Sequence, residues 1–483
     1  MTEGLLAFDS RQRLRPALAE RFEISDDGLT YTFHLRRNVT FHNGDAFTAA
    51  DVVNSWKMIV DPAFPAWSRL GWEKIKQIDT PDDFTAVITT KEIYAPFLST
   101  IGSGAFNVAA ILPSSQLGKG VKAFVADAGK RPIGTGPLTF DRRDGDRIVL
   151  ARFKDYWGSK AKLDSVIVRV FPENDYAGQL AAFQAGEIQI AARTGIPGAS
   201  LLPAALTMPD AKVLQFPGLT WGHLDLKNVG FLQETKVRQA LDFATPVDQI
   251  IAKVLGGEAT PAFADQAPGS WTYHGSLQPR PTNLSMARRL LREAKFEAGT
   301  DGVRMRGGTP LEIELWGEAS DPQAKRILDL VAESWAKIGV KTRVRLANRD
   351  LLWGPTGYQF SDKMTAAFFR WSNANDPDDM FYWHSSQIPL APGGRGGNLP
   401  AYFRPYGFQK KMDDLTSRAA AETDPARRKD LYWKIQELLY QETPVIFMFW
   451  DRNYSAVSPT VGGYWPSAFT YLLWNAKDWY VTG

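Results

Sequence analysis

The sequence predicts an α/β protein with several domains. Its 483 residues correspond to about three domains of ordinary size. In one stretch of the chain, a strand-like segment (311–316), a helical segment (322–338) and a second strand-like segment (341–346) follow one another. This order is typical of an α/β unit in which a helix joins two parallel strands. The composition, with 44% hydrophobic and 23% charged residues, is that of a globular protein.

The first 90 residues predict strands around one helix. Residues 30–35 alternate between apolar and polar side chains, as a half-buried strand does, and residues 84–90 have strand character as well. Thr48 is suited to cap a helix that continues to Ile59, because Asp51 stands at the third helical position. The expected order is therefore strand, turn, strand, turn and helix, followed by another strand.

The rest of the chain predicts further strands and helices. The expected strands are 147–152, 165–171, 188–191 and 445–450. The expected helices are 175–185, 283–294 and a helical region 235–255 that is interrupted near Thr245-Pro246. A last helix is expected to begin at Pro425, because proline is favoured at the first helical position. Residues 130–137 are rich in glycine and proline, so they are a candidate crossing between subdomains.

Composition and charge exclude several classes of function. The chain contains no cysteine, which excludes disulfides, zinc ribbons, iron–sulfur clusters and a thiol nucleophile, and its 5 histidines leave few options for a metal site. A net charge of +3 is not the strongly basic footprint of a nucleic-acid-binding protein. The longest apolar run, 445–450, is too short to span a membrane, and the first residues show no export signal. The sequence therefore indicates no cofactor, no metal and no nucleic-acid partner.

Catalytic motifs are missing from the sequence as well. It contains no Gly-x-Ser-x-Gly elbow, no His-Glu-x-x-His helix and no Walker loop. Asp376, Asp378 and Asp379 lie close together among aromatic residues, and a pair of carboxylates can hydrolyse glycosides. The same residues, however, form a good turn and helix start. We therefore predict a protein that is not an enzyme, and we keep a carbohydrate-active hydrolase that uses the Asp376 region as the alternative.

Several short motifs occur in a fixed order along most of the chain. They include Glu3-Gly4-Leu5-Leu6, Asp26-Asp27-Gly28-Leu29-Thr30, Val39-Thr40-Phe41-His42-Asn43-Gly44, Ile133-Gly134-Thr135-Gly136-Pro137, Tyr156-Trp157, Val237-Arg238-Gln239-Ala240-Leu241, and Trp371 with Asp376-Pro377. In this order and spacing the chain resembles solute-binding protein family 5, the extracytoplasmic proteins that serve ABC importers of peptides, nickel and opines. One motif alone would be weak, whereas the series is specific.

The resemblance implies a two-lobe periplasmic-binding-protein fold, also called a Venus-flytrap fold, with an extra N-terminal subdomain. The subdomain would be 3–132, the hinge-side lobe 133–220 plus 452–483, and the second lobe 221–451. A first strand and an export signal, which family members carry before the Glu-Gly-Leu motif, are expected to be missing. The implied function is a periplasmic, monomeric substrate-binding component that delivers an oligopeptide, opine or sugar conjugate to the permease subunits of an ABC importer.

The resemblance also implies where a ligand binds. In the family, the strand that ends at Trp371 reaches the cleft between the lobes. Many peptide-binding members place an aspartate three residues later to pair with the α-ammonium of the peptide, and this chain has Ala374 there. Neutral hydrogen bonds are expected from Ser372 and Asn373, and cationic contacts from Arg370 and Arg395, which favours an acidic or polyhydroxyl ligand. Further candidates near the hinge and cleft are Trp450, Asp451, Trp221, His223, Trp67 and Asn398.

Overall fold

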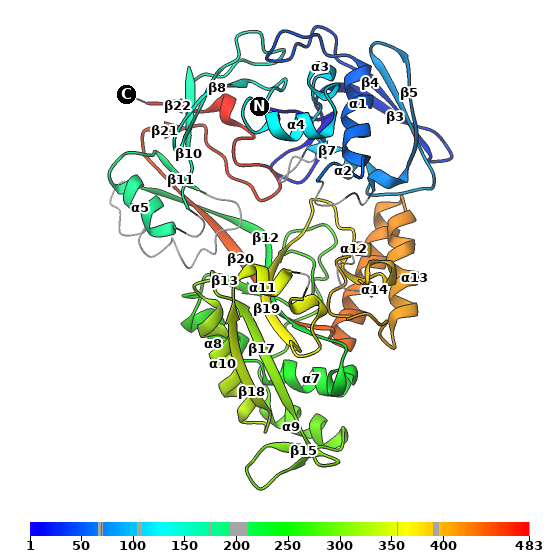
Figure 1. The fold of residues 1–483 in the computed structure, drawn as a ribbon, viewed down its shortest axis with the longest axis vertical. Helices are drawn as coiled ribbons and strands as arrows, with labels where there is room; N and C mark the ends of the chain where they lie inside the picture. Colours follow the sequence, from blue (N-terminus) through cyan, green and yellow to red (C-terminus); the bar gives the residue numbers. More distant parts are fainter. Residues whose placement is uncertain are drawn as a thin grey trace.

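Two long antiparallel strands, β12 (Lys212–Leu226) and β20 (Val445–Val457), connect an upper and a lower half of the molecule (Figure 1). The upper half contains the chain before β12 and after β20, and the lower half contains the chain between these strands. The computed structural model describes residues 1–65, 69, 71–103, 109–172, 175–192, 211–354, 356–389 and 396–482. Within these residues, helices are combined with sheets, which confirms the α/β class.

An antiparallel sheet with one helix on it forms the N-terminal part of the upper half. Its strands, in spatial order, are β3 (Ala19–Ile24), β4 (Thr30–Leu35), β6 (Thr85–Thr90) and β5 (Ile75–Asp82). Helix α1 (Ala49–Val60) buries Val52 and Trp56 in the core beneath the sheet. Its expected cap is confirmed, since the backbone N–H of Thr48 donates to the Asp51 carboxylate at 2.8 Å.

The remaining elements of the upper half are small. They are β1 (Leu6–Phe8), β2 (Leu14–Pro16), α2 (Phe97–Thr100), β7 (Gly102–Ser103), α3 (Ser114–Leu117), α4 (Val121–Ala128), β8 (Leu138–Asp144), β9 (Arg147–Arg152), β10 (Ser165–Arg169), α5 (Tyr176–Gln184), β21 (Val461–Gly462) and β22 (Tyr480–Val481). The predicted strands at 147–152 and 165–171 correspond to β9 and β10, which pair antiparallel. Strand β8, which the sequence analysis did not predict, completes their sheet on the other side of β9.

Three of the sequence motifs meet at one buried carboxylate. Glu3 accepts hydrogen bonds from the Thr135 hydroxyl at 2.9 Å, the Tyr156 phenol at 2.8 Å and the Trp157 indole at 2.9 Å. Burial raises the pKa of Glu3, and these three hydrogen bonds oppose that shift by favouring the charged form. Three motifs that are far apart in the sequence thus each supply one part of this contact.

A mixed sheet runs from the upper half into the lower half. Its strands, in spatial order, are β11 (Ile190–Ala192), β20, β12, β19 (Ala366–Ser372), β17 (Glu312–Glu318) and β18 (Lys341–Ala347), and β13 (Ala259–Pro261) also pairs with β20. Strand β17 is parallel to both β18 and β19, whereas β12 is antiparallel to β19 and β20. The predicted strand–helix–strand unit is confirmed as β17, α10 (Ala324–Ala336) and β18.

Helices cover the sheet in the lower half (Figure 1). They are α7 (Thr235–Ala244), α8 (Val247–Lys253), α9 (Leu284–Glu293), α11 (Arg349–Trp353), α12 (Met380–Trp383), α13 (Gln409–Ala421) and α14 (Pro425–Glu442), and a small sheet of β14 (Glu297–Ala298), β15 (Arg304–Arg306) and β16 (Thr309–Pro310) lies beside them. The predicted interruption of the helical region 235–255 is confirmed: α7 ends at Ala244 and α8 begins at Val247, because Pro246 lacks the N–H that a continuous helix needs. Among the described residues, no helix is long and apolar enough to cross a membrane.

The crossing between the halves lies within β12 and β20. Their register shifts between Pro217 and Trp221, where the pairing with β20 passes from Arg452 to Trp450. Gly218 lies so close to the other strand that a Cβ there would stand 2.4 Å from the carbonyl oxygen of Asp451. The predicted division into 3–132, 133–220 plus 452–483, and 221–451 stays a prediction, although this irregularity lies next to two of its boundaries.

Candidate functional site

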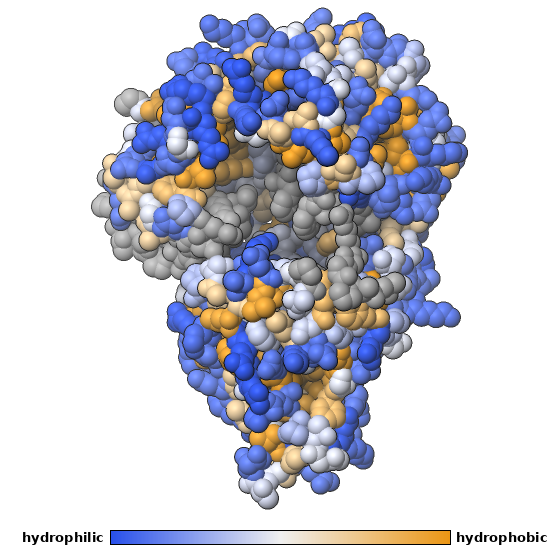
Figure 2. All heavy atoms as spheres, viewed as in Figure 1, coloured by the Kyte–Doolittle hydropathy of each residue, from blue (hydrophilic) through white to orange (hydrophobic). Residues whose placement is uncertain are grey.

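The C-terminal end of β19 lies beside the crossing between the halves. Trp371 pairs with Trp221 of β12, which in turn pairs with Trp450 of β20, so the register brings three tryptophans together. Figure 2 shows that the face of the molecule is hollowed between the two halves. The sequence candidates on these three strands therefore lie together, next to the boundary between the halves.

The aromatic rings at this position form one cluster. The ring centroids of Trp221 and Trp371 are 5.4 Å apart, and Trp371 stacks on Tyr382 at 4.7 Å. Trp221 and His223 have no exposed surface, and Trp450 is 2% exposed. Trp371 is only half-buried. In this conformation Trp221, His223 and Trp450 therefore support the cluster from behind, and Trp371 and Tyr382 are its partly exposed members.

The polar residues after Trp371 are mostly engaged within the protein. The Ser372 hydroxyl lies 2.7 Å from the hydroxyl of Thr220. Asn373 is buried and accepts a hydrogen bond from the Trp221 indole at 2.8 Å. Ala374, by contrast, is exposed. Asn373 therefore positions the tryptophan cluster, and the position of the expected ammonium anchor faces outward without a charge.

Arg370 and Asp451 form a nearly buried ion pair between β19 and β20. Arg370 Nε lies 3.1 Å from Asp451 Oδ2, and the guanidinium also contacts the carboxylate of Asp321 and, at 2.6 Å, the amide oxygen of Gln323. Burial raises the pKa of Asp451 to about 6, although Arg370 favours the charged form. The structure thus brings the two sequence candidates together as partners of each other.

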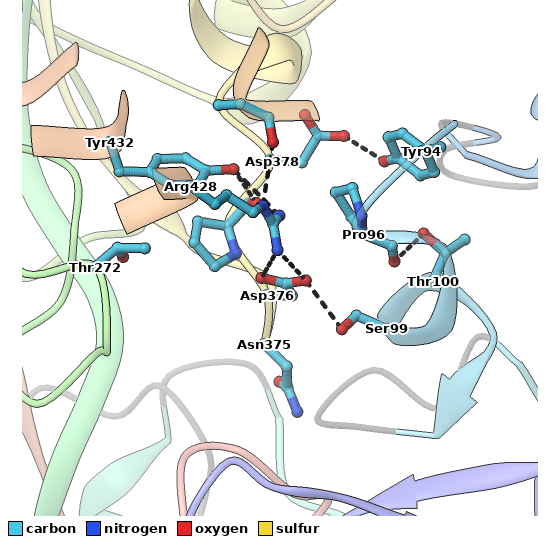
Figure 3. A network of polar contacts seen from close by, with 12 residues as sticks. Tyr94, Pro96, Ser99, Thr100, Thr272, Asn375, Asp376, Asp378, Arg428 and Tyr432 are labelled. Carbon is cyan, nitrogen blue, oxygen red and sulfur yellow. Dashed lines mark hydrogen bonds and ion pairs between the residues drawn. The ribbon is translucent and has the colours of Figure 1, made fainter. Parts of the chain in front are cut away.

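A second arginine holds the carboxylate of Asp376 (Figure 3). Arg428 of α14 donates from Nη1 to both Asp376 oxygens, at 3.1 and 3.0 Å. Burial raises the pKa of Asp376, and the Arg428 charge opposes this shift. The neighbouring Asp378 accepts a hydrogen bond from the Tyr94 phenol. The carboxylates of Asp376 and Asp378 are therefore both engaged by other side chains of the protein, so these two do not form an available pair of the kind that glycoside hydrolysis needs.

The remaining sequence candidates lie elsewhere or outside the described residues. Asn398 is buried, and its side-chain amide donates to the backbone oxygen of His384 at 3.4 Å. No contact in the described part of the chain joins Asn398 to the tryptophan cluster. Trp67 and Arg395 lie outside the residues that the structure describes.

A group of buried polar residues behind Asn373 was not predicted from the sequence. Asp265 accepts a hydrogen bond from the Trp383 indole at 2.5 Å, and Gln266 donates to Asp379 at 2.9 Å. The side-chain amide of Asn373 donates to the backbone oxygen of Asp265. Burial raises the pKa of Asp265 to about 6. Asp265 and Asp379 are more than 100 positions apart in the sequence, so no local pattern could have joined them.

This arrangement suits binding rather than catalysis. The carboxylates of Asp376 and Asp451 each have an arginine partner, and the accessible part of the site includes Trp371, Ser372 and Ala374. No group of three or more acidic or histidine residues that could hold a metal occurs among the described residues. A half-exposed tryptophan can stack on a planar or aliphatic part of a ligand.

Comparisons with known proteins agree with this assignment. Residues 13–388 match the model of the family described as bacterial extracellular solute-binding proteins, family 5 Middle. The chain is 30% identical over 488 residues to heme-binding protein A of Haemophilus influenzae, covering 95% of this chain and 83% of that one. It is 29% identical over 491 residues to a dipeptide-binding protein of Pseudomonas aeruginosa, covering 95% and 85%. An ABC transporter-associated periplasmic binding protein from Helicobacter pylori, solved in complex with the peptide STSA, has a TM-score of 0.79 at 26% identity and covers 100% of this chain and 92% of that chain.

Proposed function

The chain belongs to family 5 of the bacterial extracellular solute-binding proteins, and from this premise we propose that it captures one small solute between its two halves and delivers it to the permease of an ABC importer. Members of the family are binding proteins of ABC transporters, not enzymes. The hydrolase alternative is therefore rejected, and the Asp376–Arg428 pair gives the physical reason. We place the protein in the periplasm as a monomer.

The observation that carries this proposal is the position of Trp371. It is half-buried at the boundary between halves that are joined by two strands, and ligand sites commonly lie at such boundaries. Two-lobe binding proteins close around a ligand by hinge motion. The structure supplies a pair of crossing strands with an irregular register at which such a motion could occur.

Closure on a ligand is the first expected result. Small-angle scattering should show a smaller radius of gyration when a bound ligand is present than when it is absent. Candidate ligands are dipeptides, glutathione and opines, together with any compound that mass spectrometry finds in the purified protein. A ligand that binds by calorimetry but leaves the radius of gyration unchanged would contradict hinge closure.

We further propose that the ligand is a peptide-like or opine-type solute that is not held by an α-ammonium group. Ala374 stands where the peptide-binding relatives are expected to have a carboxylate. Two alternative acids, Asp376 and Asp451, already have arginine partners. A buried ammonium without a charged partner costs free energy, so free di- and tripeptides should bind weakly.

Restoring the carboxylate tests this proposal. In Ala374→Asp we expect the affinity for a free tripeptide to rise about tenfold, because hydrogen bonds to charged groups contribute about 1.5–3 kcal/mol. The variant should fold normally, since Ala374 is exposed. Ala374→Asn is the control, which has nearly the same shape without the charge. Calorimetry with tripeptides and their N-acetylated forms measures the effect, and equal affinities for both forms in Ala374→Asp would contradict it.

A further inference from the structure

Polar contacts join the upper and lower halves at a place beside the crossing strands. In Figure 1, α2 lies above α13 and α14, to the right of β12 and β20. The contacts form between residues 94–99 of the upper half and three residues of the lower half, Asp376, Asp378 and Ala420. We call this set of contacts the clasp.

Each contact in the clasp has its donor in the upper half. The Ser99 hydroxyl donates to Asp376 Oδ2 at 3.2 Å, and the Tyr94 phenol donates to the Asp378 carboxylate (Figure 3). The backbone N–H of Ala95 donates to the carbonyl oxygen of Ala420 at 2.7 Å. Two of the three acceptors are carboxylates, and hydrogen bonds to charged acceptors are stronger than neutral ones.

The lower side of the clasp is built by Arg428. Besides its two contacts to Asp376, its guanidinium donates from Nη2 to the Pro377 carbonyl at 3.1 Å and from Nε to the Ala419 carbonyl at 3.1 Å. One buried side chain thus fixes both the Asp376 carboxylate and the end of α13 that presents Ala420. All of these partners lie in the lower half, so this surface can remain assembled when the halves separate.

Apolar packing shields the clasp from water. Ala420 is buried in the core cluster of the N-terminal sheet, although it belongs to the lower half, and Met380 packs against the same cluster. Tyr94 and Phe97, on either side of the contact with Ala420, are 3% and 0% exposed. Excluding water strengthens the polar contacts, since competing solvent is removed and the local dielectric is low.

We propose that the clasp stabilises the closed arrangement through contacts of the protein with itself, so that closure does not depend on the ligand alone. This inference rests on the proposed function, because closure then serves solute capture. Apparent affinity scales with the fraction of molecules in the binding-competent state. The clasp therefore tunes affinity from residues that are separate from the tryptophan cluster.

The test measures closure without any ligand. The chain has no cysteine, so spin labels can be attached to Lys57→Cys in α1 and Lys410→Cys in α13, both exposed positions. Double electron–electron resonance on the dialysed protein then measures the distances between the two spin labels and gives the ratio of closed to open molecules. In Tyr94→Phe/Ser99→Ala we expect this ratio to fall about tenfold, since two hydrogen bonds to carboxylates are lost.

The matched control is Tyr464→Phe/Ser115→Ala. It removes the same two kinds of hydroxyl, but neither bonds to the lower half. The Tyr464 hydroxyl lies 2.8 Å from that of Ser455, in the part of β20 that pairs with β11, and the Ser115 hydroxyl donates to Asp45 at 2.5 Å within the upper half. Its ratio should equal that of the parent protein. An equal ratio in the clasp variant would overturn the proposal. If the double variant loses its cooperative melting transition, the single variants are measured instead, and an unchanged ratio in both has the same consequence.

This experiment separates the clasp from the proposed function. A protein that binds none of the candidate solutes can still show the shift in closed fraction, because no ligand is present. A protein that binds a solute with the same closed fraction in the clasp and control variants would retain its function and refute the clasp.

Discussion

Arg370→Leu should lower the free energy of unfolding by about 3–5 kcal/mol at pH 8. The substitution leaves Asp451, which is 2% exposed, without its cationic partner, and a buried charge that loses its partner is strongly destabilising. Asp321, which also contacts Arg370, adds negative charge to the same site. Denaturant unfolding followed by circular dichroism measures the loss.

The loss should be smaller at pH 5 than at pH 8. The pKa of Asp451 is already raised to about 6 by burial, above its value of about 3.9 in an unfolded chain. A raised carboxyl pKa means that the folded state binds the proton more tightly, so this contribution to stability is lost as the pH rises through the folded pKa. Removing Arg370 takes away the charge that favoured the ionised form of Asp451, so the pKa of Asp451 rises further. The pH range over which stability is lost then extends above pH 6.

Two variants make this prediction specific. Arg370→Leu/Asp451→Leu removes both charges and should recover much of the stability, because replacing a buried pair by apolar groups is often neutral. Arg418→Leu removes a pair whose side chains are each 60% exposed, and should change stability by less than about 1 kcal/mol. A loss in Arg370→Leu that does not vary with pH would show that Asp451 does not carry the effect.

Local patterns in the sequence predicted most of the regular elements but not the crossing strand. Helix α1 has its cap residues adjacent in sequence, and β17, α10 and β18 have clear periodicity. The first crossing strand, β12, was not predicted, because buried polar residues such as His223 and Asp225 interrupt its apolar pattern. Strand β20 was expected to end at Trp450 but continues to Val457, where it pairs with the upper half.

The partners of the candidate site residues could not be predicted either. The sequence correctly placed Trp371 at the end of a strand, but the pairing of Arg370 with Asp451 depends on the register of three strands far apart in the chain. Arg428 lies 52 positions from Asp376, on a helix whose apolar stripe gave no sign of a buried arginine. The use of Trp371, Arg370 and Asp451 as ligand contacts stays a prediction.

Trp221→Ala should lower stability more than Trp371→Ala, whereas Trp371→Ala should lower ligand affinity more than Trp221→Ala. Trp221 has no exposed surface, so its truncation leaves a cavity and should cost about 3–5 kcal/mol of stability. It also removes the indole donor to Asn373, which leaves a buried amide oxygen without this partner. Trp371 is half-buried, so its truncation should cost about half as much stability. Thermal and denaturant unfolding measure both losses.

Ligand affinity should fall more in Trp371→Ala than in Trp221→Ala, which is the reverse of the order for stability. Aromatic anchors at accessible positions commonly contribute 2 kcal/mol or more to binding, so Trp371→Ala should weaken affinity by about thirtyfold in the folded fraction. Trp221→Ala should retain affinity more closely at a temperature where it is folded, because Trp221 lies behind Trp371 and does not reach the surface. Trp465→Ala, at a position 63% exposed, is the stability control and should change the unfolding free energy by no more than about 0.5 kcal/mol. If Trp371→Ala loses stability as Trp221→Ala does and binds ligand unchanged, then Trp371 belongs to the core, and the ligand must contact other residues at the boundary between the halves.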